Sequence, residues 1–77
     1  MYVHIGDDKV VRKKDIVFIM DLDSSTVSVH TRSFLNKAQK ENRVVVLGYD
    51  LPKSFVVTKD NTVYLSSFNS TTIEGKA

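Results

Sequence analysis

Hydrophobic and polar positions alternate at the start of the chain in a pattern typical of a β-strand. In residues 2–5, Val3 and Ile5 fall on one side of the predicted strand and the other two residues on the opposite side. The Gly-Asp-Asp sequence at 6–8 is a turn signal, and residues 9–12 form a short return strand. The first twelve residues therefore predict a β-hairpin.

Three later segments, 16–20, 44–47 and 55–57, are hydrophobic at every position. A strand with one exposed face alternates between hydrophobic and polar residues, so these segments are predicted to be strands with both faces covered.

A second hairpin is predicted in the C-terminal half of the chain. Its strands are residues 55–58 and 63–65, and the intervening Lys-Asp-Asn at 59–61 forms the turn. Asp and Asn tolerate the left-handed backbone that such a turn requires. Pro52 suits the entrance of this hairpin, because proline lacks the N–H that a strand interior needs.

Residues 28–42 show helical periodicity, and Thr26 or Ser28 is expected to cap the helix at its N-terminus. The hydrophobic stripe, at i, i+3, i+4 and i+7 spacing, consists of Thr31, Phe34, Leu35 and Ala38. Polar and basic side chains lie opposite the stripe, which is typical of a helix packed over a sheet. Residues 70–74 predict a further short helical turn that begins at a serine or threonine cap.

Length and composition indicate one domain, 1–77, with a small core and no cysteine to supply a disulfide. The expected fold class is α+β: a small, mostly antiparallel sheet of two hairpins plus central strands, with one main helix. That helix covers one face of the sheet. At about 25 cal/mol per Å² of apolar area, leaving the second face in water would cost several kcal/mol. The second face is therefore expected to pack on another copy in a homo-oligomer, unless the sheet curls on itself.

No residue pattern indicates catalysis. The Asp-x-Asp-x-Ser sequence at 21–25 imitates the nucleophile motif of haloacid-dehalogenase-like phosphotransferases, but this chain is too short for the doubly wound sheet which that chemistry needs. It is interpreted as a loop whose side chains bond to local backbone. His4 and His30 match no zinc-ligand spacing, and the three glycines are too scattered for a phosphate loop. We expect no enzyme, no metal, no cofactor and no small-molecule substrate.

Charge and hydropathy add little to this picture. The net charge of +2 permits nucleic-acid binding without requiring it, and the basic triplet at 12–14 is either a solvated loop or a ligand contact. The chain begins without a signal-peptide pattern, and its longest hydrophobic run is far shorter than a membrane span. We therefore expect a soluble cytoplasmic protein that does not interact with a membrane.

Four segments spread over nearly the whole chain resemble the RemA/RemB family of extracellular matrix regulatory proteins, at 1–8, 10–17, 52–58 and 66–73. The resemblance implies a bacterial regulator of transcription of biofilm-matrix genes. It also implies a LytTR-like protomer, a ring-shaped homo-oligomer, and duplex DNA bound mainly through its backbone phosphates.

One departure from this family bears on DNA binding. RemA-like members carry an arginine pair in the turn before the second hairpin, where this chain has Leu51-Pro52. The bidentate grip of arginine is therefore absent at that turn. The cations left to contact DNA are Arg12, Lys13, Lys14, Lys53 and Lys59. The alternative is a protein-interaction or structural ring module that does not itself bind DNA.

Overall fold

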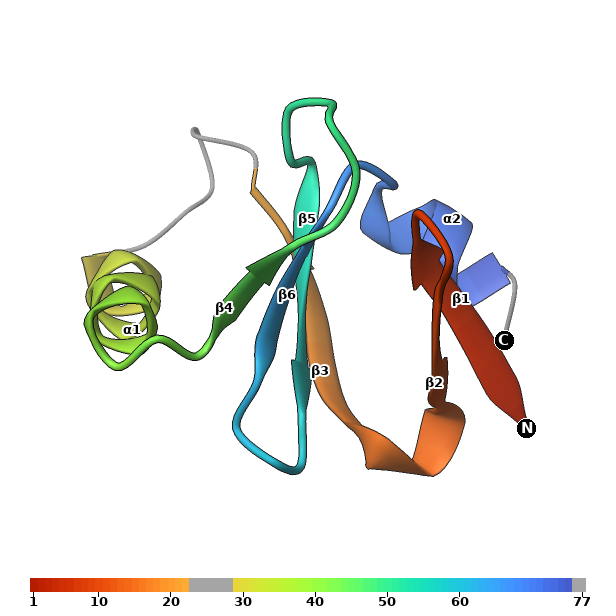
Figure 1. Cartoon of the computed structure of the whole chain (residues 1–77), viewed down its shortest axis with the longest axis horizontal. Helices are drawn as coiled ribbons and strands as arrows, with labels where there is room; N and C mark the ends of the chain where they lie inside the picture. Colours follow the sequence, from red (N-terminus) through yellow and green to blue (C-terminus); the bar gives the residue numbers. More distant parts are fainter. Residues whose placement is uncertain (23–28, 76–77) are drawn as a thin grey trace.

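The computed structural model describes residues 1–22 and 29–75, which form a small α+β fold (Figure 1). The elements in chain order are β1 (Tyr2–Gly6), β2 (Lys9–Arg12), the 3-10 turn η1 (Lys13–Asp15), β3 (Ile16–Asp21), α1 (Val29–Lys40), β4 (Val44–Val46), β5 (Ser54–Thr58), β6 (Val63–Ser66) and α2 (Ser70–Gly75). Both predicted hairpins and the main helix are confirmed. The predicted N-caps Thr26 and Ser28, and most of the loop at 21–26, lie outside the described residues.

Four strands form the central sheet in the order β3-β5-β6-β4, and β1 pairs with β2 in a separate two-stranded sheet. The expectation of one sheet containing both hairpins is therefore wrong. β5 runs antiparallel to both of its neighbours, whereas β4 runs parallel to β6. The parallel pair arises because the chain leaves β4, crosses to the middle of the sheet as β5, and returns as β6 beside β4. Every residue of β5 is buried, as predicted for its hydrophobic centre.

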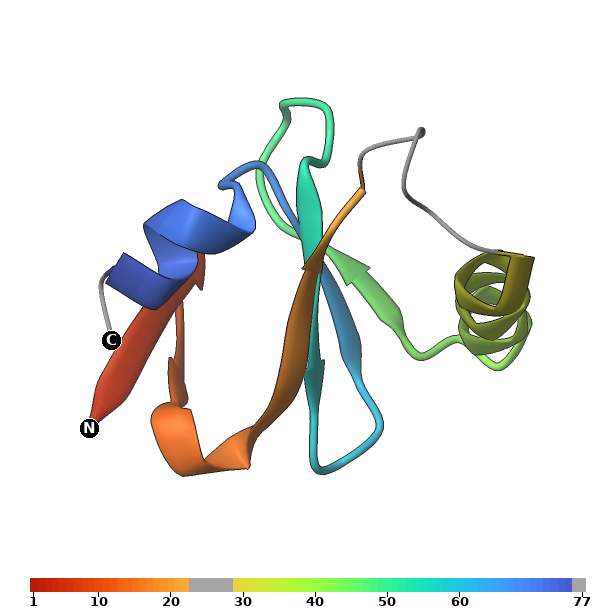
Figure 2. The ribbon, with the colours of Figure 1, turned by 180° about the vertical axis from the view of Figure 1, so that it is seen from behind.

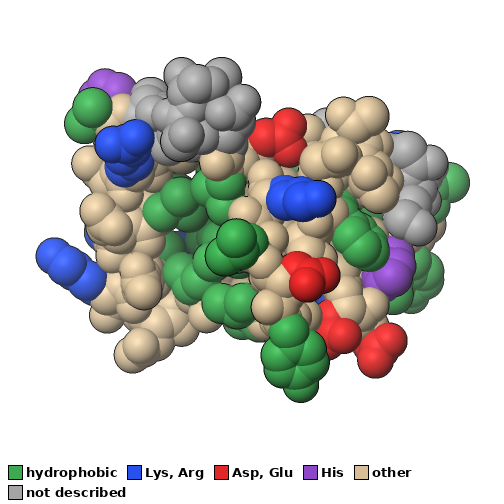
Figure 3. All heavy atoms as spheres, turned by 90° about the horizontal axis from the view of Figure 1, so that it is seen from above, with side chains coloured by type: hydrophobic (Ala, Val, Ile, Leu, Met, Phe, Trp, Pro, Cys, Tyr) green, Lys and Arg blue, Asp and Glu red, His purple; other side chains and the backbone are tan. Residues whose placement is uncertain are grey.

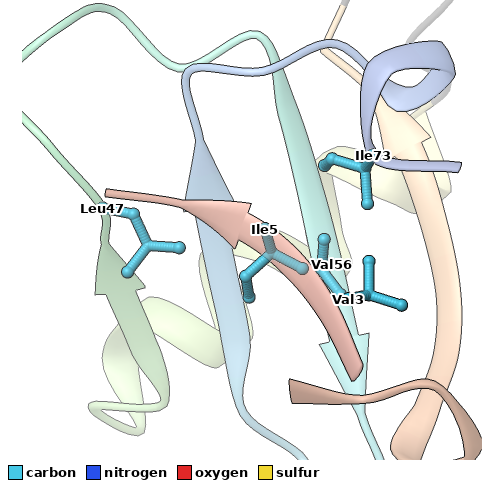
Figure 4. Close-up of a cluster of buried hydrophobic side chains, with 5 residues drawn as sticks. All are labelled: Val3, Ile5, Leu47, Val56 and Ile73. Atoms are coloured by element: carbon cyan, nitrogen blue, oxygen red, sulfur yellow. The ribbon is translucent and has the colours of Figure 1, made fainter. Parts of the chain in front are cut away.

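The β1–β2 hairpin and α2 together cover one face of the central sheet (Figures 1 and 2). Buried side chains from both covers and from the sheet form a continuous core, made of Val3, Ile5, Leu47, Val56 and Ile73 (Figure 4). The expectation that this face lacks a cover within the chain is therefore wrong. A hairpin that folds over the sheet, rather than extending it, buries this face without a second copy.

Buried serine hydroxyl groups tie this cover to the sheet. The Ser66 Oγ donates a hydrogen bond to the carbonyl of Ile5 and accepts one from the backbone N–H of Phe68 at 3.0 Å. The Ser54 Oγ donates to the Phe68 carbonyl at 2.6 Å. The polar groups of two central strands are thus satisfied inside the core, where an unmet hydrogen bond is expensive.

The opposite face carries α1, whose predicted stripe faces the sheet. Ala38 is the one fully buried residue of this helix, and Phe34 and Leu35 are half-buried against the sheet residues Phe55 and Val63. We call this side of the molecule the α1 face. The ring of Phe34 on the helix contacts the ring of Phe18 on β3. The helix covers the sheet only partly, because its hydrophobic stripe is narrow.

The two edge strands of the sheet leave hydrophobic side chains exposed. They belong to β3 (Val17, Phe18 and Met20) and to β4 (Val45 and Val46, of which Val46 is 59% exposed). One chain alone therefore does not cover both faces of segments 16–20 and 44–47, and the packing of a second copy against them stays a prediction. Each edge strand has a pairing partner on one side alone, and α1 does not reach over either of them completely.

The short helix α2 is capped differently from the prediction. The Asn69 Oδ1 accepts a hydrogen bond from the Thr72 N–H at 2.7 Å, so the N-cap is Asn69 and not Ser70 or Thr71. The carboxylate of Asp21, at the end of β3, accepts bonds from the N–H and hydroxyl of Ser70 at 2.7 and 2.8 Å. Asp21 therefore anchors α2 to the central sheet.

Candidate nucleic-acid interface

The β5–β6 turn and η1 lie side by side at one end of the sheet, the lower end in Figure 1. The Lys59 N–H donates a hydrogen bond to the Asp15 carbonyl at 2.8 Å and joins the two segments. The structure therefore brings together four of the predicted DNA-binding residues. We call this set the basic edge: Arg12, Lys13, Lys14 and Lys59, all of them exposed.

Lys53, the fifth predicted residue, is not part of the basic edge. Its backbone pairs with Ser66 and Leu22 at the opposite end of the sheet, at 2.7 and 2.8 Å. The five residues of β5 separate Lys53 from Lys59, and a strand of this length spans roughly 17 Å. One Lys53 side chain and one basic edge therefore lie at opposite ends of the same protomer.

Acidic groups near the basic edge are already engaged. The Arg12 Nε lies 2.9 Å from the Asp15 Oδ2, and this contact is the one ion pair of the basic edge among the described residues. A hydrogen bond from the Thr58 hydroxyl, with a further one from the Thr62 N–H, lowers the pKa of Asp60. The three lysines of the edge thus remain available to an external anion.

A groove runs between β2 and the β5–β6 hairpin, next to the basic edge, with a volume of about 600 Å³. Its lining includes Tyr2, Lys9, Arg12, Asp15, Lys59 and Tyr64. The Lys9 Nζ lies 5.2 Å from the centre of the Tyr64 ring, a cation–π contact. Sequence reasoning treated Lys9 only as a strand residue, since no local pattern brings residues 9 and 64 together.

The end of the sheet that carries Lys53 is mainly hydrophobic. The loop between β4 and β5 exposes Tyr49 completely, and the Leu51 side chain is 85% exposed. Figure 3 looks onto this end and shows hydrophobic side chains gathered at its centre, with acidic and basic side chains around them. The nearby space under α1 is a second groove of about 260 Å³, lined by Leu22, Leu35, Gln39, Val44, Val46 and Leu65.

In residues 1–22 and 29–75, no group of three or more His, Cys, Asp or Glu side chains is arranged to hold a metal ion. Within the same ranges, neither helix has the length and apolar character required to cross a bilayer.

The structure thus defines a small α+β domain that brings four exposed basic side chains together along one edge. The chain belongs to the RemA-like family, described as "Extracellular matrix regulatory protein A-like", whose profile matches residues 2–76. It is also 40% identical over 77 residues to extracellular matrix regulatory protein B of Bacillus subtilis (strain 168). That alignment covers 100% of this chain and 90% of the relative. The family resemblance predicted from the four sequence segments is confirmed.

Proposed function

We propose that this protein is a cytoplasmic, oligomeric, DNA-associated regulator of transcription that controls extracellular matrix genes. The family description and the name of the B. subtilis relative support a role in matrix regulation. The main support for a DNA contact is the position of Lys59. It lies beside the basic triplet at 12–14, although the two segments are far apart in the sequence.

The chemistry of the basic edge favours phosphate contacts over base recognition. Lysine ammonium groups act as flexible point charges, whereas base reading relies on planar, bidentate groups. Arg12, the single guanidinium of the edge, is already paired with Asp15. Each phosphate neutralised releases counterions, so binding should weaken steeply as salt rises.

Self-association would place several basic edges along one duplex. A second copy packed against the exposed hydrophobic side chains of β3 and β4 would bury apolar area that one chain leaves in water. Several weak contacts on one assembly then act at high effective concentration, which raises the overall affinity. Light scattering should give a mass of several chains, and Phe18→Lys should shift it toward one chain.

Fluorescence anisotropy with a labelled duplex, over a series of salt concentrations, tests the DNA contact. Lys13→Gln with Lys59→Gln should weaken binding at low salt at least tenfold and should flatten the salt dependence. The matched control is Lys37→Gln with Lys40→Gln, which removes the same charge from α1 and should leave the affinity within about twofold. Undetectable binding at low salt, or equal losses in both double variants, would contradict the proposal.

The exposed loop of Tyr49 and Leu51 favours a second candidate function, a protein-interaction module that does not bind DNA. This loop presents hydrophobic side chains at the turn where the family resemblance implies an arginine pair. Under this reading, Leu51→Lys changes the assembled mass, while the basic-edge variants change nothing measurable. The same two experiments therefore separate the two functions.

A further inference from the structure

We propose that the groove between β2 and the β5–β6 hairpin binds a small phosphorylated ligand of the nucleoside polyphosphate class. We name it the β2 groove. Its volume of about 600 Å³ lies within the range of small-molecule pockets, roughly 300–1,000 Å³. It is distinct from the exposed face of η1, where Lys13 and Lys14 border a neighbouring hollow.

The β2 groove holds cations that are placed to meet phosphate groups. The Tyr64 ring holds the Lys9 ammonium inside the groove at 5.2 Å, and Lys59 lines the groove from the β5–β6 turn. Neither lysine has an ion-pair partner among the described residues. Two ammonium groups that approach one hollow from different elements are well suited to a ligand with more than one phosphate.

The carboxylates of the groove do not cancel this charge. Asp15 is paired with the Arg12 Nε at 2.9 Å, and Asp60 accepts hydrogen bonds from Thr58 and from the Thr62 N–H. Arg12 offsets the charge of Asp15, whereas Asp60 keeps its negative charge because its hydrogen-bond donors are neutral groups. The cations Lys9, Arg12 and Lys59 still outnumber the two carboxylates that line the groove.

An aromatic surface completes the site. Tyr2 is 66% exposed and lines the β2 groove beside Arg12, with which it pairs across the β1–β2 hairpin. Nucleobases stack on such rings without requiring base-specific hydrogen bonds. Phosphates on Lys9 and Lys59, with a base against Tyr2, thus give the ligand two kinds of contact and favour a nucleotide over inorganic phosphate.

Isothermal titration calorimetry on the full chain tests this site with ATP, adenosine and pyrophosphate. We expect ATP to bind and the other two compounds to bind at least tenfold more weakly, because each carries half of the contacts. Lys9→Gln with Lys59→Gln should weaken ATP binding at least tenfold. The control Lys37→Gln with Lys40→Gln should leave it unchanged, and circular dichroism should show that both variants keep the fold.

The proposal would be overturned by no binding of ATP at millimolar concentration, by equal binding by the two double variants, or by pyrophosphate binding as tightly as ATP. A short single-stranded oligonucleotide that binds the groove far more tightly than ATP would also overturn it in favour of nucleic acid. The single variant Lys9→Gln distinguishes ATP binding in the β2 groove from DNA binding at the basic edge. It should reduce ATP binding while duplex affinity stays within about twofold, because Lys9 is not part of the basic edge.

Discussion

The two faces of the central sheet are covered to very different degrees. On one face, the β1–β2 hairpin and α2 supply the fully buried side chains Val3, Ile5 and Ile73. On the other face, α1 supplies one fully buried residue, Ala38, while its larger side chains Phe34 and Leu35 remain half-buried. The chain therefore buries the large side chains of its own cover completely on the first face, which we call the hairpin face, and only partly on the α1 face.

We infer from this difference that the two faces have different roles. The hairpin face buries apolar area and pairs its inner hydroxyl groups, and both contribute to the stability of one protomer. The α1 face keeps hydrophobic side chains of both edge strands in contact with water, which is costly unless a partner covers them. Stability and association can then be altered independently.

The largest expected effect comes from truncating a matched pair of side chains, one from each cover. Ile5→Ala should lower the free energy of unfolding by about 2–5 kcal/mol, because it leaves a cavity in a fully buried site. Leu35→Ala should cost less, about 1–2 kcal/mol, since Leu35 is only partly buried and alanine favours a helix. Urea denaturation measures both. Equal losses would show that the two faces contribute equally to stability.

A smaller effect is expected from the hydroxyl group that ties β1 to the sheet. Ser66→Ala removes a donor to the buried carbonyl of Ile5 and an acceptor for the Phe68 N–H. The cost should be about 1–3 kcal/mol. Ser67→Ala, on the neighbouring residue, is the control. If both variants denature at the same urea concentration, the hydrogen bonds of Ser66 do not stabilise the hairpin face.

Much of this fold is predictable from the sequence, because local periodicity specifies elements. The stripe of α1 and the turn at Asn61, whose φ is 67°, follow directly from residue type and spacing. Pairing between elements is not local, so nothing in residues 2–12 distinguishes a hairpin that extends the sheet from one that folds over it. The role of Asp21 is likewise hidden, since its partner Ser70 lies 49 residues away.

The candidate site shows the same limit. The basic triplet at 12–14 is visible in the sequence, but its proximity to Lys59 depends on the antiparallel pairing of β3 with β5, which places Ile16 opposite Thr58. Lys53 and Lys59 are close in sequence, yet β5 carries them to opposite ends of the sheet. Charge composition therefore predicts which residues can contact an anion, and topology decides which of them act together.

A moderate loss of stability is expected when the N-cap of α2 is removed. Asn69→Ala removes the acceptor for the Thr72 N–H and should cost about 1 kcal/mol of the free energy of unfolding. Asn69→Asp keeps an acceptor at the same position and should restore most of that stability. Because α2 belongs to the hairpin face, the loss of stability should appear in urea denaturation without a change in the assembled mass. A change in mass alone would instead place α2 at an interface between copies.

The smallest expected effect lies at the β5–β6 turn, outside both covers, and depends on pH. Hydrogen bonds from the Thr58 hydroxyl and the Thr62 N–H favour the ionised carboxylate and hold the pKa of Asp60 below its ordinary value of 3.8. The folded state therefore binds the proton less readily than the unfolded chain does. The resulting stabilisation is present above pH 3.8 and is lost as the pH falls through the lowered pKa of the folded protein.

Asp60→Asn should consequently lower the melting temperature slightly at neutral pH, and the gap to the unaltered protein should close as the solution is acidified. Asp50→Asn, which removes the same charge from the loop at the far end of the sheet, serves as the matched control. Thermal melts between pH 7 and strongly acidic conditions measure both variants. A gap for Asp60→Asn that does not depend on pH would show that the turn is stabilised by the shape of the side chain and not by its charge. The basic edge would then keep its geometry even where the carboxylate is neutral.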